Sequence, residues 1–301
     1  MKIKEPGKVT DRITLLGRGE SNVYLLDGGS EAAIIGGGMV YIVPEVLEQI
    51  REMAVDTEKI KRIVILHSHF DHCGIVPFFK KQWPRAAVAA SAPAKAMLAR
   101  PKVIETINAM NHETLKRRGR LDDAKEKGYA DFEGIDVEQV LEDGQKIACG
   151  DLTLEILAVP GHSSCSIAVY VPEQKALFAS DAGGIEAGDE IFTAANSDFD
   201  KYQQSLEKMA GLDIAVYLAE HYGARTGQDA AKFLNRSISA AAEFRTRIEQ
   251  SLAQTGDPEK TAKDLVAEKM ENSPSDLLPA EIISMIVGQM VYFVAKQKGM
   301  A

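Results

Sequence analysis

The stretch RIVILHSHFDH, residues 62–72, joins a short apolar run to a dense group of metal-binding side chains. Its first five residues are mostly β-branched and apolar, as expected of a buried strand that ends directly at His67. His67 and His69 can face one ion from an extended loop, and Asp71 and His72 follow closely enough to serve a second. Because a strand-end loop is held by its scaffold while its side chains stay accessible, the pattern predicts a metal site.

Three further candidate ligands follow predicted strands later in the chain. Each stands one to four residues after an apolar, strand-like run, and they are His162, Asp181 and His221. Five of the six histidines therefore occupy strand-end positions. Only His112 lies elsewhere, and we expect it on the surface or on a lid. Alone, each later residue is ambiguous, but their joint placement favours the ligand interpretation.

The order HxHxDH, then His, Asp and His resembles the metallo-β-lactamase superfamily over roughly residues 10–225. The resemblance implies an α/β fold, the four-layer αβ/βα metallo-β-lactamase sandwich, with metals at one edge of its two sheets. It also implies two divalent transition-metal ions, Zn, Fe or Mn, since imidazole and carboxylate serve all three. The implied ligands are His67, His69 and His162 for the first ion, Asp71, His72 and His221 for the second, and Asp181 as the bridge.

The chain departs from this family at Gly36-Gly37-Gly38, which follows the expected strand Ala32–Ile35. Family members commonly carry an acidic residue at this point. Because that acid usually supports the metal ligands from outside, the departure affects the support geometry rather than the ligands themselves.

A closer resemblance is to the quinolone-signal response thioesterases of the PqsE type. It is carried by HFDHCGIVPF at residues 69–78 and by LLPAE at residues 277–281. It implies a similar length and a similar helical extension at the C-terminal end.

The chain is expected to divide into a metallo-β-lactamase-fold domain, residues 1–227, and a C-terminal helical extension, residues 228–301, that covers the active-site cleft. The first contains a helical insertion at about residues 94–130. The extension carries apolar residues at helical spacing, which predicts a buried helix face. They are Leu234, Ile238, Ala241, Ile248 and Leu252.

Composition narrows the expected partners. The net charge of −9 is spread along the chain, which disfavours nucleic acid because phosphate contacts need clustered Lys and Arg. The apolar run at residues 282–295 is shorter than the roughly 20 residues of a membrane span and predicts a core helix. Three cysteines and no apolar leader favour a cytoplasmic protein. A homodimer is expected if the extension leaves apolar surface exposed.

These features predict metal-assisted hydrolysis of a small-molecule substrate. Two dications sharing a water lower its pKa from about 15.7 toward about 7, so that a metal-bridging hydroxide can attack an ester, thioester or lactone. Asp71 is the candidate catalytic residue, because it could orient that hydroxide or move a proton. Tyr222 and Glu186 are candidate substrate contacts. The alternatives are a phosphodiesterase, and a di-iron redox or regulatory protein on the same fold.

Overall fold

The computed structural model describes residues 1–188, 190–272 and 280–300. The contacts of the chain divide it into two compact units. The first consists of Met1–Ala158, Cys165–Ser180 and Ile214–Ala231, and the second of Val159–Ser164, Asp181–Asp213 and Lys232–Ala301. The predicted domain boundary between residues 227 and 228, and the covering role of the extension, stay predictions.

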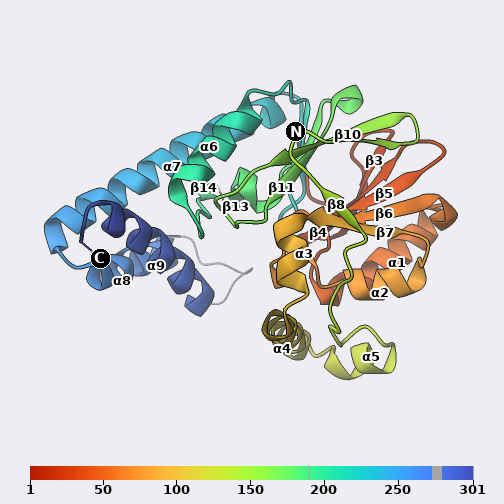
Figure 1. Cartoon of the computed structure of the whole chain (residues 1–301), viewed down its shortest axis with the longest axis horizontal. Coiled ribbons are helices and arrows are strands. Elements are labelled where there is room, and N and C mark those ends of the chain that lie inside the picture. The colour runs from red at the N-terminus through yellow and green to blue at the C-terminus, as the bar shows by residue number, and fades with distance from the viewer. Residues whose placement is uncertain (189, 273–279, 301) are drawn as a thin grey trace. The chain divides into compact units, whose positions relative to one another are not determined.

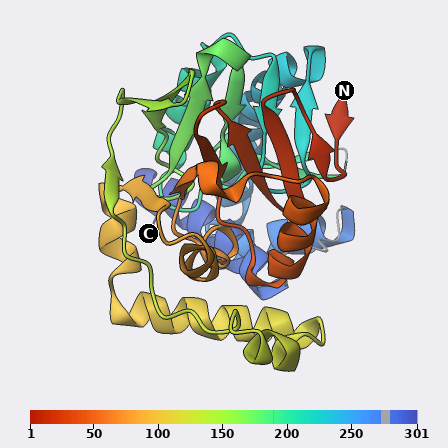
Figure 2. The same cartoon turned by 90° about the vertical axis from the view of Figure 1, so that its right-hand side faces the viewer.

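Two mixed seven-stranded sheets form the first unit (Figures 1 and 2). In spatial order, one consists of β2 (Gly7–Lys8), β3 (Ile13–Arg18), β4 (Ser21–Asp27), β5 (Ala32–Ile35), β6 (Ile60–Val64), β7 (Ala87–Ser91) and β8 (Gln139–Leu141). The other consists of β1 (Lys2–Ile3), β16 (Ala224–Thr226), β15 (Val216–Leu218), β12 (Ala176–Phe178), β11 (Ile167–Val171), β10 (Leu152–Ala158) and β9 (Lys146–Cys149). Pairing is parallel from β5 to β8 and between β12 and β15.

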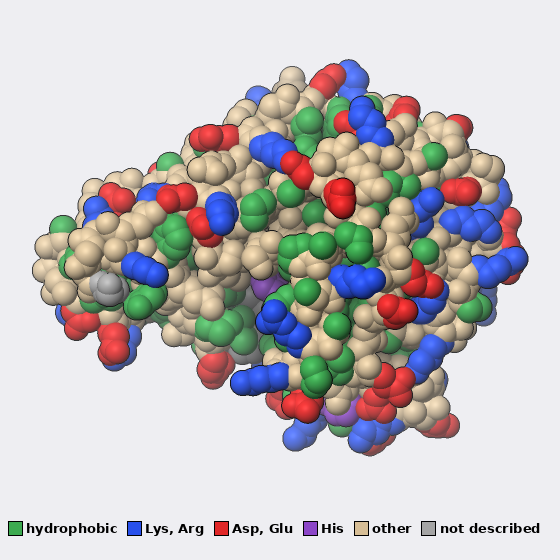
Figure 3. Space-filling model, in the orientation of Figure 1, with side chains coloured by type: hydrophobic (Ala, Val, Ile, Leu, Met, Phe, Trp, Pro, Cys, Tyr) green, Lys and Arg blue, Asp and Glu red, His purple; other side chains and the backbone are tan. Residues whose placement is uncertain are grey.

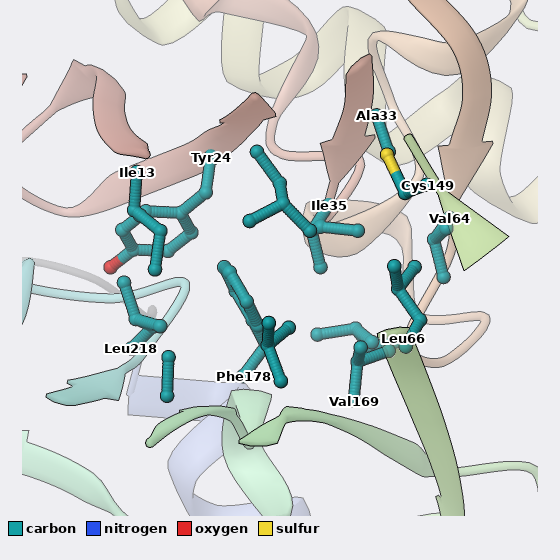
Figure 4. Packing of buried hydrophobic residues seen from close by; sticks show 14 of the residues in the cluster. Ile13, Tyr24, Ala33, Ile35, Val64, Leu66, Cys149, Val169, Phe178 and Leu218 are labelled. Atoms are coloured by element: carbon teal, nitrogen blue, oxygen red, sulfur yellow. The ribbon is translucent and has the colours of Figure 1, made fainter. Parts of the chain in front are cut away.

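The core of this unit lies between the inner faces of the two sheets (Figure 4). Tyr24 on β4 meets Phe178 on β12 edge to face, with ring centroids 5.6 Å apart. Leu26 and Val169 extend the same apolar layer on the two sides. Each such side chain contributes about 1.5–3 kcal/mol by leaving water, so the core holds the strand ends of both sheets in fixed positions.

Helices flank the β2–β8 sheet (Figure 1). They are α1 (Val43–Glu52), α2 (Val76–Gln82), α3 (Ala92–Leu98), α4 (Pro101–Arg117) and α5 (Leu121–Glu126). Ser91 begins α3, because its hydroxyl accepts a hydrogen bond from the Ala94 amide at 3.2 Å. α4 and α5 account for most of the helical insertion predicted for residues 94–130.

The second unit contains one hairpin and four helices among its described residues. The hairpin pairs β13 (Ile185–Ala187) with β14 (Glu190–Phe192), and the helices are α6 (Phe199–Ala210), α7 (Gln228–Thr255), α8 (Pro258–Asn272) and α9 (Ala280–Gln297). α7 begins at the end of the first unit. Of the predicted helical stripe, Leu234, Ala241, Ile248 and Leu252 are buried, as predicted, and Ile238 is half-buried. Of the LLPAE segment, residues 277–279 lie outside the described residues.

The surface shows no separation of charge by sign on the face drawn in Figure 3, where acidic and basic side chains are interspersed. Within the part of the chain that the structure describes, no helix combines the length and the apolar character needed to cross a membrane. The run at residues 282–295 lies in α9, whose Ile286, Met290 and Val294 are buried. The prediction of a core helix there is confirmed.

Candidate metal centre

The loop after β6 brings three imidazoles into contact. β6 ends at Val64, and a short 3-10 helix, Phe70–His72, closes when the His72 amide donates to the His69 carbonyl at 3.0 Å. The His67 ring centroid lies 4.6 Å from that of His69 and 4.1 Å from that of His72. His67 and His72 are buried, so the loop gathers nitrogen donors away from bulk solvent.

A second strand end supplies the next imidazole of the first unit. β12 and β15 are parallel, so their carboxyl ends lie at one edge of the sheet and place Ser180 and Glu220 there. His221 follows Glu220, and its ring centroid is 4.7 Å from that of His72. A tight turn holds this segment, in which the Tyr222 amide donates to the Gly19 carbonyl at 2.8 Å.

Asp71, His72 and His221 form the centre of the group. Their potential ligand atoms all lie within 4.8 Å of one another. The Nε2 atoms of the two histidines are 3.1 Å apart, and Asp71 Oδ2 is 3.5 Å from His72 Nε2 and 3.6 Å from His221 Nε2. Burial alone raises the pKa of Asp71, but the two imidazoles, when protonated, hold that pKa well below its usual range through the charge of His72 and the hydrogen bonds from both rings.

The Nδ1 atoms of His72 and His221, here called the outer nitrogens, fix the direction of the Nε2 atoms, the inner nitrogens, which face each other. His221 Nδ1 lies 2.6 Å from the Glu20 carbonyl oxygen, and His72 Nδ1 lies 2.9 Å from Glu220 Oε2. Since both partners only accept hydrogen bonds, each Nδ1 donates and each Nε2 carries a lone pair. Two lone pairs that face each other across 3.1 Å repel unless a cation or a proton lies between them.

This donor set fits a transition-metal ion. Two imidazole nitrogens bound to one zinc at about 2.0–2.1 Å would be about 3.3 Å apart, close to the spacing of the two Nε2 atoms. Asp71 adds a carboxylate oxygen that is ionised at neutral pH. Imidazole nitrogen with carboxylate oxygen suits zinc, iron and manganese alike.

The second unit pairs the other two predicted ligands. His162 Nε2 lies 3.4 Å from Asp181 Oδ2, and both residues are buried. His162 Nδ1 lies 2.8 Å from the Ala194 carbonyl oxygen, so this histidine too has its outer nitrogen held and its inner nitrogen turned toward a carboxylate. The arrangement repeats the pattern of His72 and His221.

Gly161 explains why His162 is preceded by glycine. Its φ of +128° suits glycine, and a Cβ there would lie 2.2 Å from the Tyr202 nitrogen, within α6. The Gly161 carbonyl accepts hydrogen bonds from the amides of Ser197 and Asp198 at 2.9 and 3.1 Å. The Pro-Gly-His segment is thereby fixed against the start of α6.

The remaining predicted residues lie in different surroundings. Tyr222 is half-buried with a φ of +60°, and its ring centroid is 6.5 Å from that of His221. Glu186 is a half-buried residue of β13. Their roles as substrate contacts stay predictions. His112 lies on α4 and contacts Asp131 at 2.8 Å, in keeping with a surface position.

Cys73 lies directly after the 3-10 helix and is fully buried. Its Sγ donates a hydrogen bond to the His69 carbonyl at 3.2 Å. Burial raises the pKa of the Cys73 thiol far above its usual value, so the sulfur stays protonated.

Sequence reasoning missed Glu220 and Ser180 as parts of this group. Glu220 is buried and contacts His72, and Ser180 contacts Glu220, His67 and His72. The signal was present in the three glycines after β5, where an acid was expected and none stands.

Comparisons with known proteins agree with this arrangement. The sequence profile of the Metallo-beta-lactamase superfamily matches residues 16–221. A metallo-beta-lactamase family protein of Thermus thermophilus superposes with a TM-score of 0.69 at 20% identity, covering 97% of this chain and 95% of the other. Two mixed seven-stranded sheets flanked by helices, together with this match, confirm the predicted fold class.

Two curated relatives match over shorter stretches. Human acyl-coenzyme A thioesterase MBLAC2 is 28% identical over 172 residues, 54% of this chain and 57% of the relative. Hydroxyacylglutathione hydrolase of Legionella pneumophila (strain Paris) is 27% identical over 122 residues, 40% of this chain and 33% of the relative. The matched part therefore spans between a third and somewhat more than half of these relatives.

Proposed function

This chain belongs to the metallo-beta-lactamase superfamily and carries the buried His/Asp group of a metal-dependent hydrolase, and from this premise we propose that it binds two metal ions and cleaves an ester, thioester or lactone. The observation that carries the proposal is the group Asp71, His72 and His221. Outer hydrogen bonds fix both imidazoles so that their inner nitrogens converge on one point beside an ionised carboxylate. Such preorganisation suits a bound cation.

A second ion is supported by the number of donors. His67 and His69 lie beside His72 in the first unit. The other two predicted ligands follow strands of the first unit in the sequence. His162 lies in a six-residue segment between β10 and Cys165, and Asp181 is the next residue after Ser180. We therefore propose His67, His69 and His162 for one ion, the group above for the other, and Asp181 as the bridge.

When bound, the ions supply Lewis-acid activation of water and of the substrate oxygen. The chain's own residues provide the rest of the mechanism. Asp71 stays ionised beside two imidazoles, so its Oδ2 can orient a water molecule. The outer acceptors on His72 and His221 keep the inner nitrogens from rotating away. Burial excludes competing water and strengthens each electrostatic contact.

The thioester is the substrate class that the relatives favour. The name of one relative contains acyl-coenzyme A and that of the other contains hydroxyacylglutathione, and in both compounds an acyl group is joined to sulfur. The resemblance to PqsE-type thioesterases, made on HFDHCGIVPF, favours the same bond and stays a prediction. A phosphodiester is the second candidate, because two ions can also stabilise an in-line displacement at phosphorus.

A di-iron redox function is less well supported. Flavodiiron-type sites usually carry a glutamate at the position of His69, and they work with a flavin domain. An imidazole at this position leaves the site fewer carboxylates to stabilise oxidised iron. A regulatory role with incidental hydrolysis remains the other alternative, and turnover numbers will separate it from true catalysis.

The test combines metal analysis with a substrate panel. Protein purified without added metal, and protein loaded with zinc, iron or manganese, is assayed on an acyl-coenzyme A, an acylated glutathione, a lactone and an aryl phosphodiester. The expected result is two ions per chain and the highest kcat/KM on a thioester. One ion or fewer in fully loaded protein refutes the dinuclear site. A preference for the phosphodiester refutes the substrate class.

Matched variants separate the site from the fold. His72→Asn and His221→Asn should lose metal and activity together, because each removes an inner nitrogen of the central group. His112→Asn is the control, since its partner is Asp131 on the surface. Unchanged activity in His72→Asn would show that the central group is not the site of hydrolysis.

A further inference from the structure

Glu220 is a buried carboxylate with a full set of partners. Its Oε2 accepts a hydrogen bond from His72 Nδ1 at 2.9 Å and another from the Ser180 hydroxyl. Its Oε1 accepts from the Gly37 amide at 3.2 Å. Only 2% of the side chain is exposed, so these three contacts replace the solvent that a carboxylate requires.

The glycines after β5 leave the space that this carboxylate occupies. A Cβ at Gly36 would lie 2.5 Å from Glu220 Oε1, and Gly36 has a φ of +94°, a conformation that side chains disfavour. A Cβ at Gly37 would lie 2.4 Å from the His72 carbonyl oxygen. A side chain at Gly36 would therefore compete with the Glu220 carboxylate for the same space.

Ser180 extends the influence of Glu220 to a second histidine. A hydroxyl has one hydrogen, and Ser180 gives it to Glu220 Oε2. Ser180 Oγ lies 3.3 Å from His67 Nδ1, and because its hydrogen is already used it can only accept a hydrogen bond from that nitrogen. The His67 Nδ1 must then carry the proton, which leaves the lone pair on Nε2. Ser180 holds this position with a φ of +50°, an uncommon conformation for a residue other than glycine.

We infer that Glu220 is the positioning residue of the metal centre, one buried carboxylate that sets the tautomer and ring orientation of His72 directly and of His67 through Ser180. It supplies from the end of β15 the support that an acid after β5 would otherwise give. The inference rests on the proposed function in one respect only, the identity of the ligand as a metal ion. The hydrogen-bond arrangement itself is independent of turnover.

The first test reads the tautomers in metal-free, full-length protein by nitrogen-15 NMR of labelled histidine. In the unaltered protein we expect His67 and His72 as Nδ1–H tautomers. Glu220→Gln should change both, because an amide presents a donor as well as an acceptor. Ser180→Ala should change His67 and leave His72 unchanged. If His72 is unaltered in Glu220→Gln, or His67 in Ser180→Ala, the inference is wrong.

The second test measures zinc affinity by chelator competition and the absorption spectrum of the cobalt-loaded protein. Losing an outer partner of a ligating histidine commonly costs about 10- to 100-fold in metal affinity. We expect a loss of that size in Glu220→Gln, a smaller one in Ser180→Ala, and altered cobalt bands in both. A zinc affinity for Glu220→Gln within about twofold of the unaltered protein would overturn the inference.

Glu138→Gln is the matched control. Glu138 is also a hydrogen-bonded carboxylate of the first unit, accepting from the Val88 amide and from Lys80 Nζ, away from the His/Asp group. The Glu138→Gln variant should leave the histidine tautomers and the zinc affinity unchanged. A loss of zinc affinity equal to that of Glu220→Gln would contradict a positioning role for Glu220. Failure of the proposed hydrolysis would appear as an inactive, metal-loaded protein with the expected tautomers, so the two failures are distinguishable.

Discussion

Replacing Gly161 by alanine should weaken the second unit at the loop that carries His162. A Cβ at this position would lie 2.2 Å from the nitrogen and 2.3 Å from the Cα of Tyr202. Both atoms are helix backbone, which cannot move aside as a flexible side chain could. A positive φ costs an L-residue about 1–2 kcal/mol, and forced overpacking adds about 1–3 kcal/mol. The expected loss of unfolding free energy is therefore about 2–5 kcal/mol.

Gly256→Ala provides the comparison that isolates the contact. Gly256 has a φ of +63°, and no atom of the described residues lies within 4 Å of the position that an added methyl group would take. Gly256→Ala should lose only the backbone part of the unfolding free energy, about 1–2 kcal/mol. For Gly161→Ala we expect Tm to fall by roughly 4–20 °C in calorimetry, since each kcal/mol lost lowers Tm by about 2–4 °C in a large domain.

The same variant should release metal more readily, because the loop that fixes His162 must shift. Chelator competition on the folded protein measures this directly. If Gly161→Ala melts at the temperature of Gly256→Ala, the close approach to α6 does not exist in solution. The explanation of the Pro-Gly-His segment would then be wrong.

The remaining predictions concern the bridge, the core, pH and assembly. Asp181→Ala should lose turnover by at least about 100-fold while melting near the normal temperature, because the residue stands in a short 3-10 turn and not in a strand of the core; full hydrolysis would show that it is not a ligand. Phe178→Ala should cost about 3–5 kcal/mol in denaturant unfolding, since its ring fills the layer between the sheets, and a loss below about 1 kcal/mol would contradict that packing. The hydrogen bond from Arg245, at 2.6 Å, lowers the pKa of Asp200. This stabilisation is present above the unfolded pKa of about 3.9 and is lost as pH falls through the lower folded pKa. Asp200→Asn should thus cost about 0.5 kcal/mol at neutral pH, a small value because the carboxylate is half exposed, and progressively less in denaturant unfolding as the pH falls below the unfolded pKa; an equal cost at neutral and strongly acidic pH would refute the assignment. Met285 and Tyr292 of α9 are 51% and 58% exposed, so light scattering at micromolar concentration should give a dimer, and a monomer would refute it.

The sequence predicted the strand ends well because the relevant runs are apolar and stop abruptly at polar residues. β5 has the predicted bounds Ala32–Ile35, and β6 (Ile60–Val64) overlaps the predicted strand at residues 62–66. Short strands such as β1 and β8 were not predicted, because two or three residues are too few to show a period of two.

The support of the site could not be predicted, because it depends on contacts between distant segments. Glu220 and Gly37 are 183 residues apart in the chain and meet only when the two sheets pack together. Nothing in the local sequence of Glu220 separates it from an ordinary acid before a histidine. The absence of an acid at Gly36 indicated that the histidines need another hydrogen-bond acceptor, but it did not indicate which residue provides one.

The position of the Cys73 thiol bears on which metal ion the protein binds. A thiolate beside the imidazoles would make the site prefer soft, sulfur-seeking ions such as zinc or copper(I). The three candidate ligand groups among the described residues contain only histidine and aspartate, and Cys73 gives its hydrogen to the His69 carbonyl, so these groups offer only nitrogen and oxygen donors. Since nitrogen and oxygen donors serve zinc, iron and manganese alike, we expect the metal content of the purified protein to change with the metals supplied in the growth medium.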